Sequence, residues 1–512
     1  MKTDVLIVGA GPTGLALAVQ LIRYGIDFVI IDKKETTTPY SKAIGVQART
    51  LEIYDQIGLA DDLVSIGWKA NIVRLVEGGE VRGHIDLNEY GKGLSPFPFL
   101  LIVEQGKHEK LLYDFIRSNE RDVRWQTELV KLTQEENGVT AEIKSQSGEY
   151  ETIDARYLIG CDGAHSLVRH TLGIEFGGST FERIFYVADV ELDWAFDHDA
   201  LTANLGKNTL TAFFPMSGER QWRIVGTFPE GHNADEGEVL FDEIEKQVFA
   251  DTELKFDITK VNWFSTYKVH SRHVNKFSEG RCFLAGDSAH IHTPAGAQGM
   301  NTGIQDAYNL TWKLAYVLRN DANPKLLDTY NEERLPNAHR LLQTTDRFFA
   351  LAASEEPVMA FFRQHIFPHV ANFALNIDAV RRVVFPLVSQ IGINYRKSSL
   401  SVGDEFKIKA GDRMPYFEIE GASIYERLHE PRFHLIAFND GKTEVAALPE
   451  DLIAKWNEQI DRTDIPLYPH ISEMFGATNS FFVLLRPDNY IGLISKDLSP
   501  EVVGSYFNIV GF

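Results

Sequence analysis

The first 32 residues constrain the fold more than any other stretch of the chain. They read as a buried strand, a glycine-rich turn (GAGPTG), a helix and a second strand, in the order Thr3–Val8, Gly9–Gly14, Leu15–Tyr24 and Asp27–Ile31. Asp32 follows the second strand directly. In such a unit the glycines let a pyrophosphate approach the backbone, the helix N-terminus binds it, and the acid accepts hydrogen bonds from a ribose. The opening therefore predicts a Rossmann-type domain that binds a dinucleotide through Gly9, Gly11, Gly14 and Asp32.

Two later strands also end near an acid. Tyr157–Ile159 runs into the stretch GCDGAHSLVR, which contains Asp162, and Arg281–Ala285 runs into a breaker-rich loop that contains Asp287. From Gly299 onwards apolar residues recur at helical spacing. A helix N-terminus has unpaired N–H groups and a partial positive charge, so it stabilises an anion. The stretch 280–313 is therefore interpreted as a place that holds a planar group which becomes negatively charged.

Composition narrows the classes of partner. The formal net charge of −21 argues against a general binder of nucleic acid or of anionic membranes. Cys161 and Cys282 both lie in apolar runs and form no CxxC pair, which fits a reducing cytoplasm. The apolar stretch Val5–Ile22 is broken by glycines and a proline, and we interpret it as neither a targeting signal nor a membrane span.

The middle and the end of the chain differ from the first part, and from each other, in their pattern of apolar and polar residues. Between about residues 175 and 274, segments alternate like strands of a half-exposed sheet and carry many aromatic residues, which favours a pocket for a flat organic molecule. Packing within the sheet is the ordinary role of any one of these aromatics. Tyr395–Gly411 reads as a linker, and the tail that follows alternates β and α patterns like a separate small domain.

The three motifs, GAGPTG with Asp32, GCDGAHSLVR and GRCFLAGDSAHIHTPAGAQGMNTGIQDAYNLTWKL, resemble in order and spacing those of the class A FAD-dependent aromatic monooxygenases, which have the p-hydroxybenzoate hydroxylase fold. The tail resembles the thioredoxin-like domain of the phenol hydroxylase and polyketide hydroxylase branch. The resemblance implies an α/β chain with a discontinuous FAD-binding domain (1–73, 100–175 and 275–395), an inserted mixed-sheet substrate domain (74–99 and 176–274) and a thioredoxin-like domain without CxxC (400–512).

The resemblance also implies roles for individual residues. FAD would be bound by Gly9, Gly11, Gly14, Asp32, Gln105, Asp162, Asp287, Pro294, Gly299, Met300 and Asn301. Among these, Pro294 would lie beside the reactive edge of the flavin, and Gly299, Met300 and Asn301 would present backbone N–H groups to its N1–C2 carbonyl edge. Many relatives have Arg where this chain has Lys42, so we expect Lys42, helped by Arg49, to supply a local phosphate contact without the bidentate fork of arginine.

The activity that the resemblance implies is a hydroxylation of a phenolic or polycyclic aromatic substrate with NADH or NADPH and O2, through a C4a-hydroperoxyflavin. Alternatives on the same fold are epoxidation, ring-expanding oxygenation, inactivation of an antibiotic, and a non-catalytic flavin-binding protein. His290 and His292 lack the carboxylate or thiolate partners of a metal site in the sequence, so no metal is expected. The sequence does not identify a protein base that would deprotonate a phenolic substrate. We expect a cytoplasmic monomer or homodimer that binds neither nucleic acid nor membranes.

Overall fold

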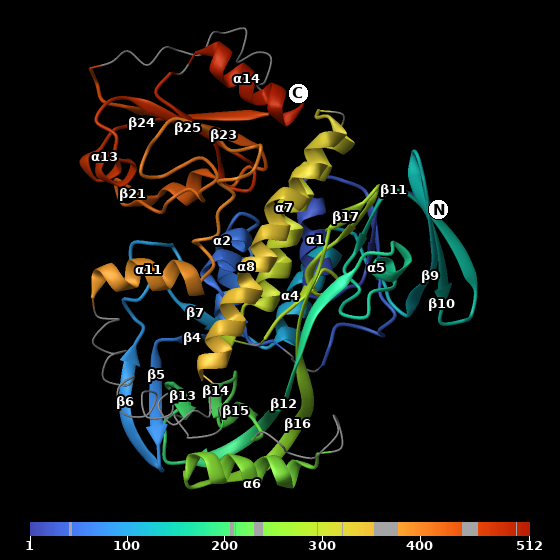
Figure 1. Ribbon diagram of the computed structural model, residues 1–512, viewed down its shortest axis with the longest axis vertical. Helices are drawn as coiled ribbons and strands as arrows, with labels where there is room; N and C mark the ends of the chain where they lie inside the picture. Colours follow the sequence, from blue (N-terminus) through green and yellow to red (C-terminus); the bar gives the residue numbers. More distant parts are fainter. Residues whose placement is uncertain are drawn as a thin grey trace.

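The structure is a computed structural model of the 512-residue chain. It describes residues 1–39, 43–204, 209, 211–229, 239–293, 295–319, 321–352, 377–442, 459–497 and 499–512. Three layers are stacked along the longest axis (Figure 1): a C-terminal sheet at the top, a central body of helices and parallel strands, and a second large sheet at the bottom.

The central body is built on the predicted strand–helix–strand opening. β1 (Lys2–Val8), α1 (Pro12–Arg23) and β2 (Phe28–Ile31) form it, and β1 pairs in parallel with both β2 and β11 (Tyr150–Gly160). The strand order is β17-β18-β11-β1-β2-β8. The strands not yet given are β17 (Ser278–Glu279), β18 (Cys282–Leu284) and β8 (Val123–Arg124). β10 (Gly138–Ser145) pairs antiparallel with β11, and β9 (Thr127–Glu135) pairs antiparallel with β10. All four residues of β2 are buried, as is typical of a parallel sheet covered on both faces.

Helix α7 (Gly299–Leu318) runs through the middle of the molecule beside α8 (Asp328–Ala352), as Figure 1 shows. Its residues 301–318 are all buried, so the helix is enclosed by the rest of the protein around its whole circumference. The helix packs on α1, and α4 (Gln105–Ser118) packs on the other side of α1. The first turn of α7 therefore lies at the centre of the chain, close to the start of α1.

The lower layer is an eight-stranded sheet in the order β19-β16-β12-β15-β14-β13-β5-β6. Its strands are β19 (His290–Ile291), β16 (Phe256–Val274), β12 (Phe176–Trp194), β15 (Gln221–Thr227), β14 (Thr211–Pro215), β13 (Leu201–Asn204), β5 (Ile72–Glu77) and β6 (Glu80–Asp86). One face packs on α6 (Phe241–Thr252), where Tyr186 and Ala188 of β12 share a core with Ile244 and Val248 of the helix. Because side chains alternate along a strand, the other face is turned towards the central body.

A small three-stranded sheet fills the space between these two layers. β7 (Leu100–Ile102) pairs with β3 (Gly45–Val46) on one side and β4 (Trp68–Ala70) on the other. Ile44, Ala70 and Ile102 form a buried cluster, against which Phe214 of β14 and Met216, the residue after β14, pack. The remaining helices of this region are α2 (Ala48–Asp55), α3 (Ala60–Ser65) and α5 (Leu167–Thr171).

The upper layer is a five-stranded sheet in the order β20-β26-β25-β23-β24. It contains β20 (Val402–Gly403), β26 (Ile491–Ser495), β25 (Phe481–Leu485), β23 (Phe433–Asn439) and β24 (Ile460–Pro466), with α13 (Pro469–Phe475), α14 (Pro500–Val510) and a hairpin of β21 (Glu418–Ile419) and β22 (Ala422–Ser423). β20 lies within the stretch 395–411 that we expected to be a linker, so that expectation is wrong for residues 402 and 403, which pair with β26. The domain boundaries themselves stay predictions.

Buried ionic groups join the upper layer to the central body. Arg486 donates to Glu333 of α8 at 2.5 and 3.1 Å and to Asp488, and Lys313 of α7 lies 2.8 Å from the same Glu333. Asp488 in turn accepts a hydrogen bond from the indole of Trp312 at 3.1 Å. These charged side chains are all at most 1% exposed, so the two layers share one closed network. α11 (Asp378–Val388) lies below this layer (Figure 1), and no helix among the described residues is long and apolar enough to cross a membrane.

Candidate functional site

The glycine-rich turn between β1 and α1 is packed as closely as its sequence predicts. Gly9 has φ +106°, and a methyl group there would lie 2.3 Å from the carbonyl oxygen of Cys161. A methyl group at Gly14 would lie 1.9 Å from the carbonyl oxygen of Gly9, whereas at Gly11 it would meet nothing within 4 Å. No side chain caps the start of α1, so its first N–H groups stay available to a phosphate beside the open space at Gly11.

Asp32 faces this turn from the end of β2. Its Oδ2 accepts a hydrogen bond from the backbone N–H of Ala10 at 2.6 Å, and its Oδ1 accepts one from the N–H of Lys34 at 2.8 Å. The carboxylate is thus held in place by backbone donors, one of them in the glycine-rich turn itself. Asp32 stands where an acid that binds a ribose is expected.

Gln105 opens helix α4 and links it to the segment before β3. Its Oε1 accepts a hydrogen bond from the N–H of Ala43 at 3.1 Å, and its Nε2 donates to Glu109 at 2.8 Å. Burial raises the pKa of Glu109, while Lys34, 4.0 Å away, acts in the opposite direction. Glu109 is a buried acid that our reading of the sequence missed, because nothing marks it among the charged residues of an amphipathic helix. Lys42 lies outside the described residues.

The second motif touches the first. Asp162 follows Cys161, whose carbonyl group packs against Gly9, and its Oδ2 accepts a hydrogen bond from the N–H of Val168 at 3.2 Å. The other oxygen, Oδ1, is buried and has no hydrogen-bond partner among the described residues. Burial raises the pKa of Asp162. A buried carboxylate oxygen without a partner is costly, so it is a natural place for a ligand donor.

The third motif packs on the first through two glycines and a threonine. A methyl group at Gly286 would lie 2.4 Å from Oγ1 of Thr13, and one at Gly303 would lie 2.3 Å from the same oxygen. Gly286 begins a short 3₁₀ turn, Gly286–Ser288, that follows β18 and contains the exposed Asp287. The turn GAGPTG, the strand β18 and helix α7 therefore meet at Thr13, and Asp287 is displayed at this meeting point.

Asp306 of α7 forms hydrogen bonds with several groups in the same region. Its Oδ2 accepts hydrogen bonds from the N–H of Gly286 at 3.0 Å and lies 2.7 Å from Nε2 of His290, and its Oδ1 accepts one from Arg334 at 2.6 Å. Burial alone would raise the pKa of Asp306, but Arg334 and His290 bring it below its usual value. His290 is thus a hydrogen-bonded partner inside the fold. Among the described residues no group of three His, Cys, Asp or Glu side chains is placed to hold a metal ion.

The first turn of α7 is fixed by the side chain of Asn301. Its Oδ1 accepts hydrogen bonds from the N–H of Gln47 at 2.9 Å and the hydroxyl of Thr50 at 2.7 Å, and its Nδ2 donates to the carbonyls of Gly45 and Ala297. The side chain therefore serves the fold and leaves the backbone N–H groups of this turn for a ligand. Gln298 makes no side-chain cap, so these donors stay uncapped.

Gly299 and Met300 each have a histidine beside them. A methyl group at Gly299 would lie 3.1 Å from Nε2 of His292, and Sδ of Met300 lies 3.3 Å from Nδ1 of His108. Burial lowers the pKa of both His108 and His292 to about 4, so both rings are neutral at pH 7. The Nε2 atom of His292 is buried without a hydrogen-bond partner among the described residues. Pro294, predicted to lie beside the flavin, is outside the described residues.

Arg49 lies apart from the other predicted residues. Its guanidinium is 1% exposed, donates to Glu52 at 3.1 Å and to the backbone carbonyl of Asp488 at 2.9 Å, and lies over the ring of Tyr490. These contacts tie α2 to the upper layer. They speak against a phosphate contact, and the expected help for Lys42 stays a prediction.

The residues at the centre fit a dinucleotide such as FAD. There are two uncapped helix starts, at α1 and α7, an open space at Gly11, and two buried polar atoms without partners, Asp162 Oδ1 and His292 Nε2. Donors at helix starts suit a pyrophosphate and an electron-rich ring edge. Asp32, Asp162 and Asp287 lie on or beside the glycine-rich turn, and their binding of FAD stays a prediction. Asp306, Glu109, His108 and His292 were missed as functional residues, because no local sequence pattern marks the contacts that each of them makes.

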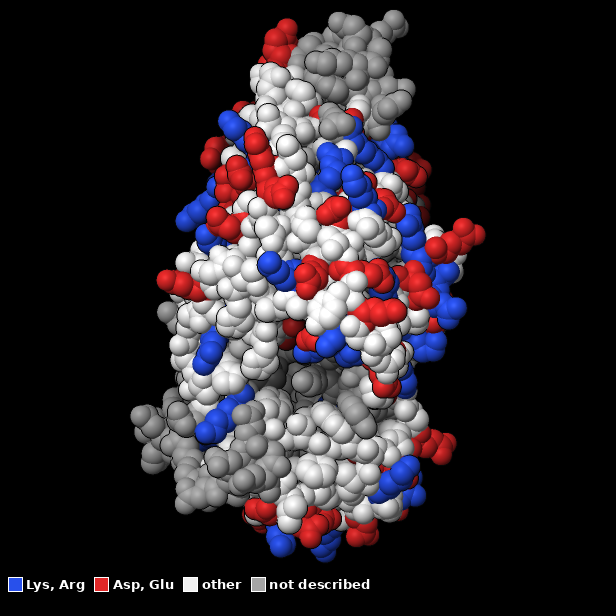
Figure 2. All heavy atoms as spheres, turned by 90° about the vertical axis from the view of Figure 1, so that its right-hand side faces the viewer, with Lys and Arg blue, Asp and Glu red and all other residues white. Residues whose placement is uncertain are grey.

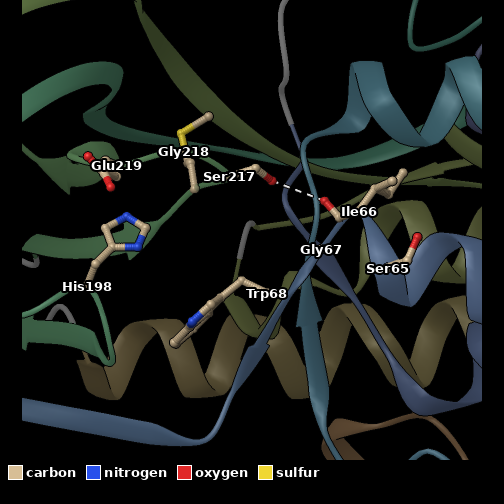
Figure 3. A pocket seen from close by; sticks show the side chains of 9 residues that line it. Ser65, Ile66, Gly67, Trp68, His198, Ser217, Gly218 and Glu219 are labelled. Carbon is tan, nitrogen blue, oxygen red and sulfur yellow. Dashed lines mark hydrogen bonds between the residues drawn. The ribbon is translucent and has the colours of Figure 1, made fainter.

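A pocket opens at the edge of the small sheet, about two strand spacings (roughly 10 Å) from β3. Its volume is about 420 Å³, in the range of small-molecule sites, and its lining residues are Ser65, Ile66, Gly67, Trp68, His198, Met216, Ser217, Gly218 and Glu219. Figure 3 shows the hydroxyl of Ser217 directed to the carbonyl of Ile66, at 3.1 Å, which joins the two walls. Trp68 and Met216 continue into the apolar cluster of Ile44 and Ile102, which leads towards β3 and α7.

The expected aromatic surface of the lower sheet is divided between its two faces. Tyr186, Phe213 and Trp222 pack in the core under α6, which is the ordinary role of a sheet aromatic. On the opposite face Phe185 and Tyr267 stack with ring centroids 5.9 Å apart, near the bidentate pair of Arg223 and Asp189 at 2.7 Å. Lysines, arginines and acids are intermixed on the upper part of the side view in Figure 2.

Comparisons with known proteins agree with this geometry. The profile of a family described as FAD binding domain matches residues 2–345. The chain is 36% identical to 6-methylpretetramide 4-monooxygenase of Streptomyces rimosus, over 95% of this chain and 90% of that protein. It is 30% identical to pentachlorophenol 4-monooxygenase of Sphingobium chlorophenolicum, over 98% and 96%. Its structure is similar to that of OxyS anhydrotetracycline hydroxylase from Streptomyces rimosus, with a TM-score of 0.77, 27% identity and coverage of 100% and 99%.

Proposed function

The chain belongs to the family of FAD-dependent monooxygenases that these relatives represent, and from that premise we propose that it hydroxylates a phenolic or polycyclic aromatic substrate with NADH or NADPH and O2. The family membership confirms the resemblance stated from the three motifs, together with the α/β fold and FAD as the cofactor. The observation that supports the proposal most directly is the close packing of Gly286 and Gly303 on Thr13, which brings the glycine-rich turn, the turn after β18 and the start of α7 together.

In this proposal the chain binds FAD at three places. The start of α1 and the open space at Gly11 receive the pyrophosphate, and Asp32 and Asp162 accept hydrogen bonds from hydroxyl groups of FAD. The first turn of α7 contacts the electron-rich edge of the flavin ring. FAD supplies the chemistry of electron transfer from the nicotinamide and of O2 activation. The residues of the chain orient it and provide fixed positive dipoles at α7, which favour the reduced, anionic ring.

The aromatic substrate enters, in this proposal, through the pocket between Trp68 and Met216. The apolar cluster behind these residues continues to Ile44 and Ile102, next to β3 and the approach to α7. Apolar walls exclude water from the space in which the oxygen atom is transferred. We assign no protein base in this pocket, and in this proposal the phenolic character of the substrate itself drives the attack.

The test is a screen of NADH and NADPH oxidation with FAD-loaded protein and a panel of phenols and polycyclic aromatics. We expect oxidation that the substrate stimulates and a product heavier by one oxygen atom. Stimulated oxidation that yields only hydrogen peroxide would contradict hydroxylation of that substrate, and a protein that retains no FAD would contradict the whole proposal. Because epoxidation and ring expansion also add one oxygen atom, the structure of the product decides among these alternatives. The same proposal includes a cytoplasmic location and a protein that is either a monomer or a homodimer.

A further inference from the structure

The pocket beside Trp68 carries negative charge and no positive charge. Of its nine lining residues, Glu219 is the only carboxylate, and none is lysine or arginine. Figure 3 shows Glu219, His198 and Trp68 on the opposite side of the view from Ser65. A pocket of this composition is unusual for an enzyme that binds a carboxylated aromatic, because such a ligand needs a cation or several donors.

Glu219 forms no ion pair within the part of the chain that the structure describes. The residue is exposed in the turn between β14 and β15, directly after Gly218, whose φ of +111° turns the chain. The neighbouring cation, Arg220, donates instead to Asp193 at 3.1 Å. Among the described residues no ion pair includes Glu219, so its charge is available to a ligand in the pocket.

A second carboxylate lies behind the wall of the pocket. Oε1 of Glu104 accepts a hydrogen bond from the N–H of Ser217 at 3.2 Å, and its Oε2 lies 3.3 Å from the hydroxyl of Ser217. Lys107 lies 3.1 Å from Glu104 and offsets part of this charge, while Glu219 has no such partner among the described residues. The net field at the mouth of the pocket therefore stays negative.

The side-chain donors of the lining residues are mostly engaged within the protein. The hydroxyl of Ser65 donates to Asp62 at 2.7 Å, and the hydroxyl of Ser217 donates to Ile66 at 3.1 Å. Nε2 of His198 lies 2.8 Å from the carbonyl of Gln221, which can only accept, so this nitrogen donates within the protein. Among the described lining residues, this leaves the indole N–H of Trp68 as a side-chain donor and the carboxylate of Glu219 as an acceptor for a ligand.

We infer that this pocket selects planar aromatic substrates that lack a carboxylate and carry a hydrogen-bond donor or a positive charge at the end that reaches Glu219. The inference rests on the hydroxylation proposed above and narrows its substrate class. Trp68 and Met216 provide the flat, polarisable wall for the aromatic ring of the substrate. Glu219 attracts a positive or hydrogen-bond-donating group at the remote end of the substrate and repels a carboxylate there.

The experiment uses three naphthols that differ in one remote substituent: hydrogen, aminomethyl or carboxylate. Their dissociation constants are measured with FAD-loaded protein, from flavin difference spectra and from quenching of tryptophan fluorescence. We expect the aminomethyl compound to bind at least about tenfold more tightly than the carboxylate, a difference of about 1.4 kcal/mol. The gap should shrink as salt is raised, because Glu219 is exposed.

Charge variants isolate the role of Glu219. Glu219→Gln should bring the three affinities together, and Glu219→Lys should reverse their order. Glu136→Lys, in the exposed turn between β9 and β10, changes the net charge by the same amount and should leave the order unchanged. Equal affinities in the unaltered protein, an order that survives Glu219→Lys, or failure of all three naphthols to bind would each overturn the inference.

The two proposals fail separately. If the naphthols bind in the expected order but none is oxygenated and no other aromatic stimulates NAD(P)H oxidation, the proposed hydroxylation is wrong and the selectivity of the pocket stands. If a carboxylated aromatic is the substrate that is hydroxylated with full coupling, the hydroxylation stands and the inference about Glu219 is wrong.

Discussion

Asp287 is the one exposed acid among the residues predicted to bind the cofactor, and it stands at the meeting point of three motifs. We expect Asp287→Ala to weaken FAD binding about 10- to 100-fold, because a hydrogen bond to a charged group contributes about 1.5–3 kcal/mol. The flavin-to-protein ratio after purification and the dissociation constant of the apo-protein measure this loss. Glu279→Ala, on the neighbouring strand β17, is the matched control, and equal flavin retention in both variants would count against the assignment.

Gly299 leaves little room for a side chain, since Nε2 of His292 would lie 3.1 Å and its Cε1 3.4 Å from an added methyl group, and a valine would reach further. Gly299→Val should therefore shift the first turn of α7 and lower the rate of substrate-stimulated NAD(P)H oxidation at least several-fold, with a change in the flavin absorption spectrum. Gly177→Ala, where an added methyl group meets nothing within 4 Å, should behave like the unaltered protein. Normal turnover in Gly299→Val would contradict the proposed place of the ring.

His108 supplies a prediction about pH. Burial lowers its pKa in the fold to about 4, below the value of about 6.5 in the unfolded chain. Between these values the unfolded state binds more protons, so stability rises from pH 4 to pH 6.5 and is lost as the pH falls through that window, by about 3 kcal/mol for this one group. In His108→Gln the urea unfolding free energy should fall less steeply between pH 6.5 and 4.5. A slope equal to that of the unaltered protein would show that His108 does not carry the effect.

At the scale of elements, the sequence predicted those whose pattern is local. The opening β1–α1–β2 and the start of α7 follow from glycine spacing, buried runs and helical periodicity. The partners of single polar residues could not be predicted in this way. Asp306 forms hydrogen bonds with Gly286 and Arg334, which are 20 and 28 residues away, and no pattern in the sequence around Asp306 indicates these contacts. The same holds for the Glu219 pocket, whose walls come from three distant segments.

Helices α7 and α8 meet the upper layer through Glu333, and this contact can be broken without removing bulk. Burial alone would raise the pKa of Glu333, but Arg486 and Lys313 hold it well below its usual range. In Glu333→Gln the buried Lys313 loses its carboxylate partner and Arg486 keeps only Asp488, so we expect a loss of about 3–5 kcal/mol in urea unfolding at pH 7. Glu332→Gln, exposed on the same helix and bonded to Ser399, should cost less than about 1 kcal/mol. Similar losses in the two variants would refute the importance of the buried network.

The packing joins the whole molecule across the expected domain boundary, so we expect it to unfold as one cooperative body. The ring of Phe433 in β23 lies 5.9 Å from that of Trp312 and 5.7 Å from that of Tyr316, both in α7, so one hydrophobic core crosses the expected boundary at residue 400. Removal of residues 400–512 would expose these rings and leave Glu333 and Lys313 without Arg486. We expect the truncated chain 1–399 to aggregate and to retain no FAD even when its cofactor residues are all present. Soluble, yellow protein from that truncation, with the melting temperature of the full chain, would mean that the upper layer is an independent unit and that α7 holds its position without it.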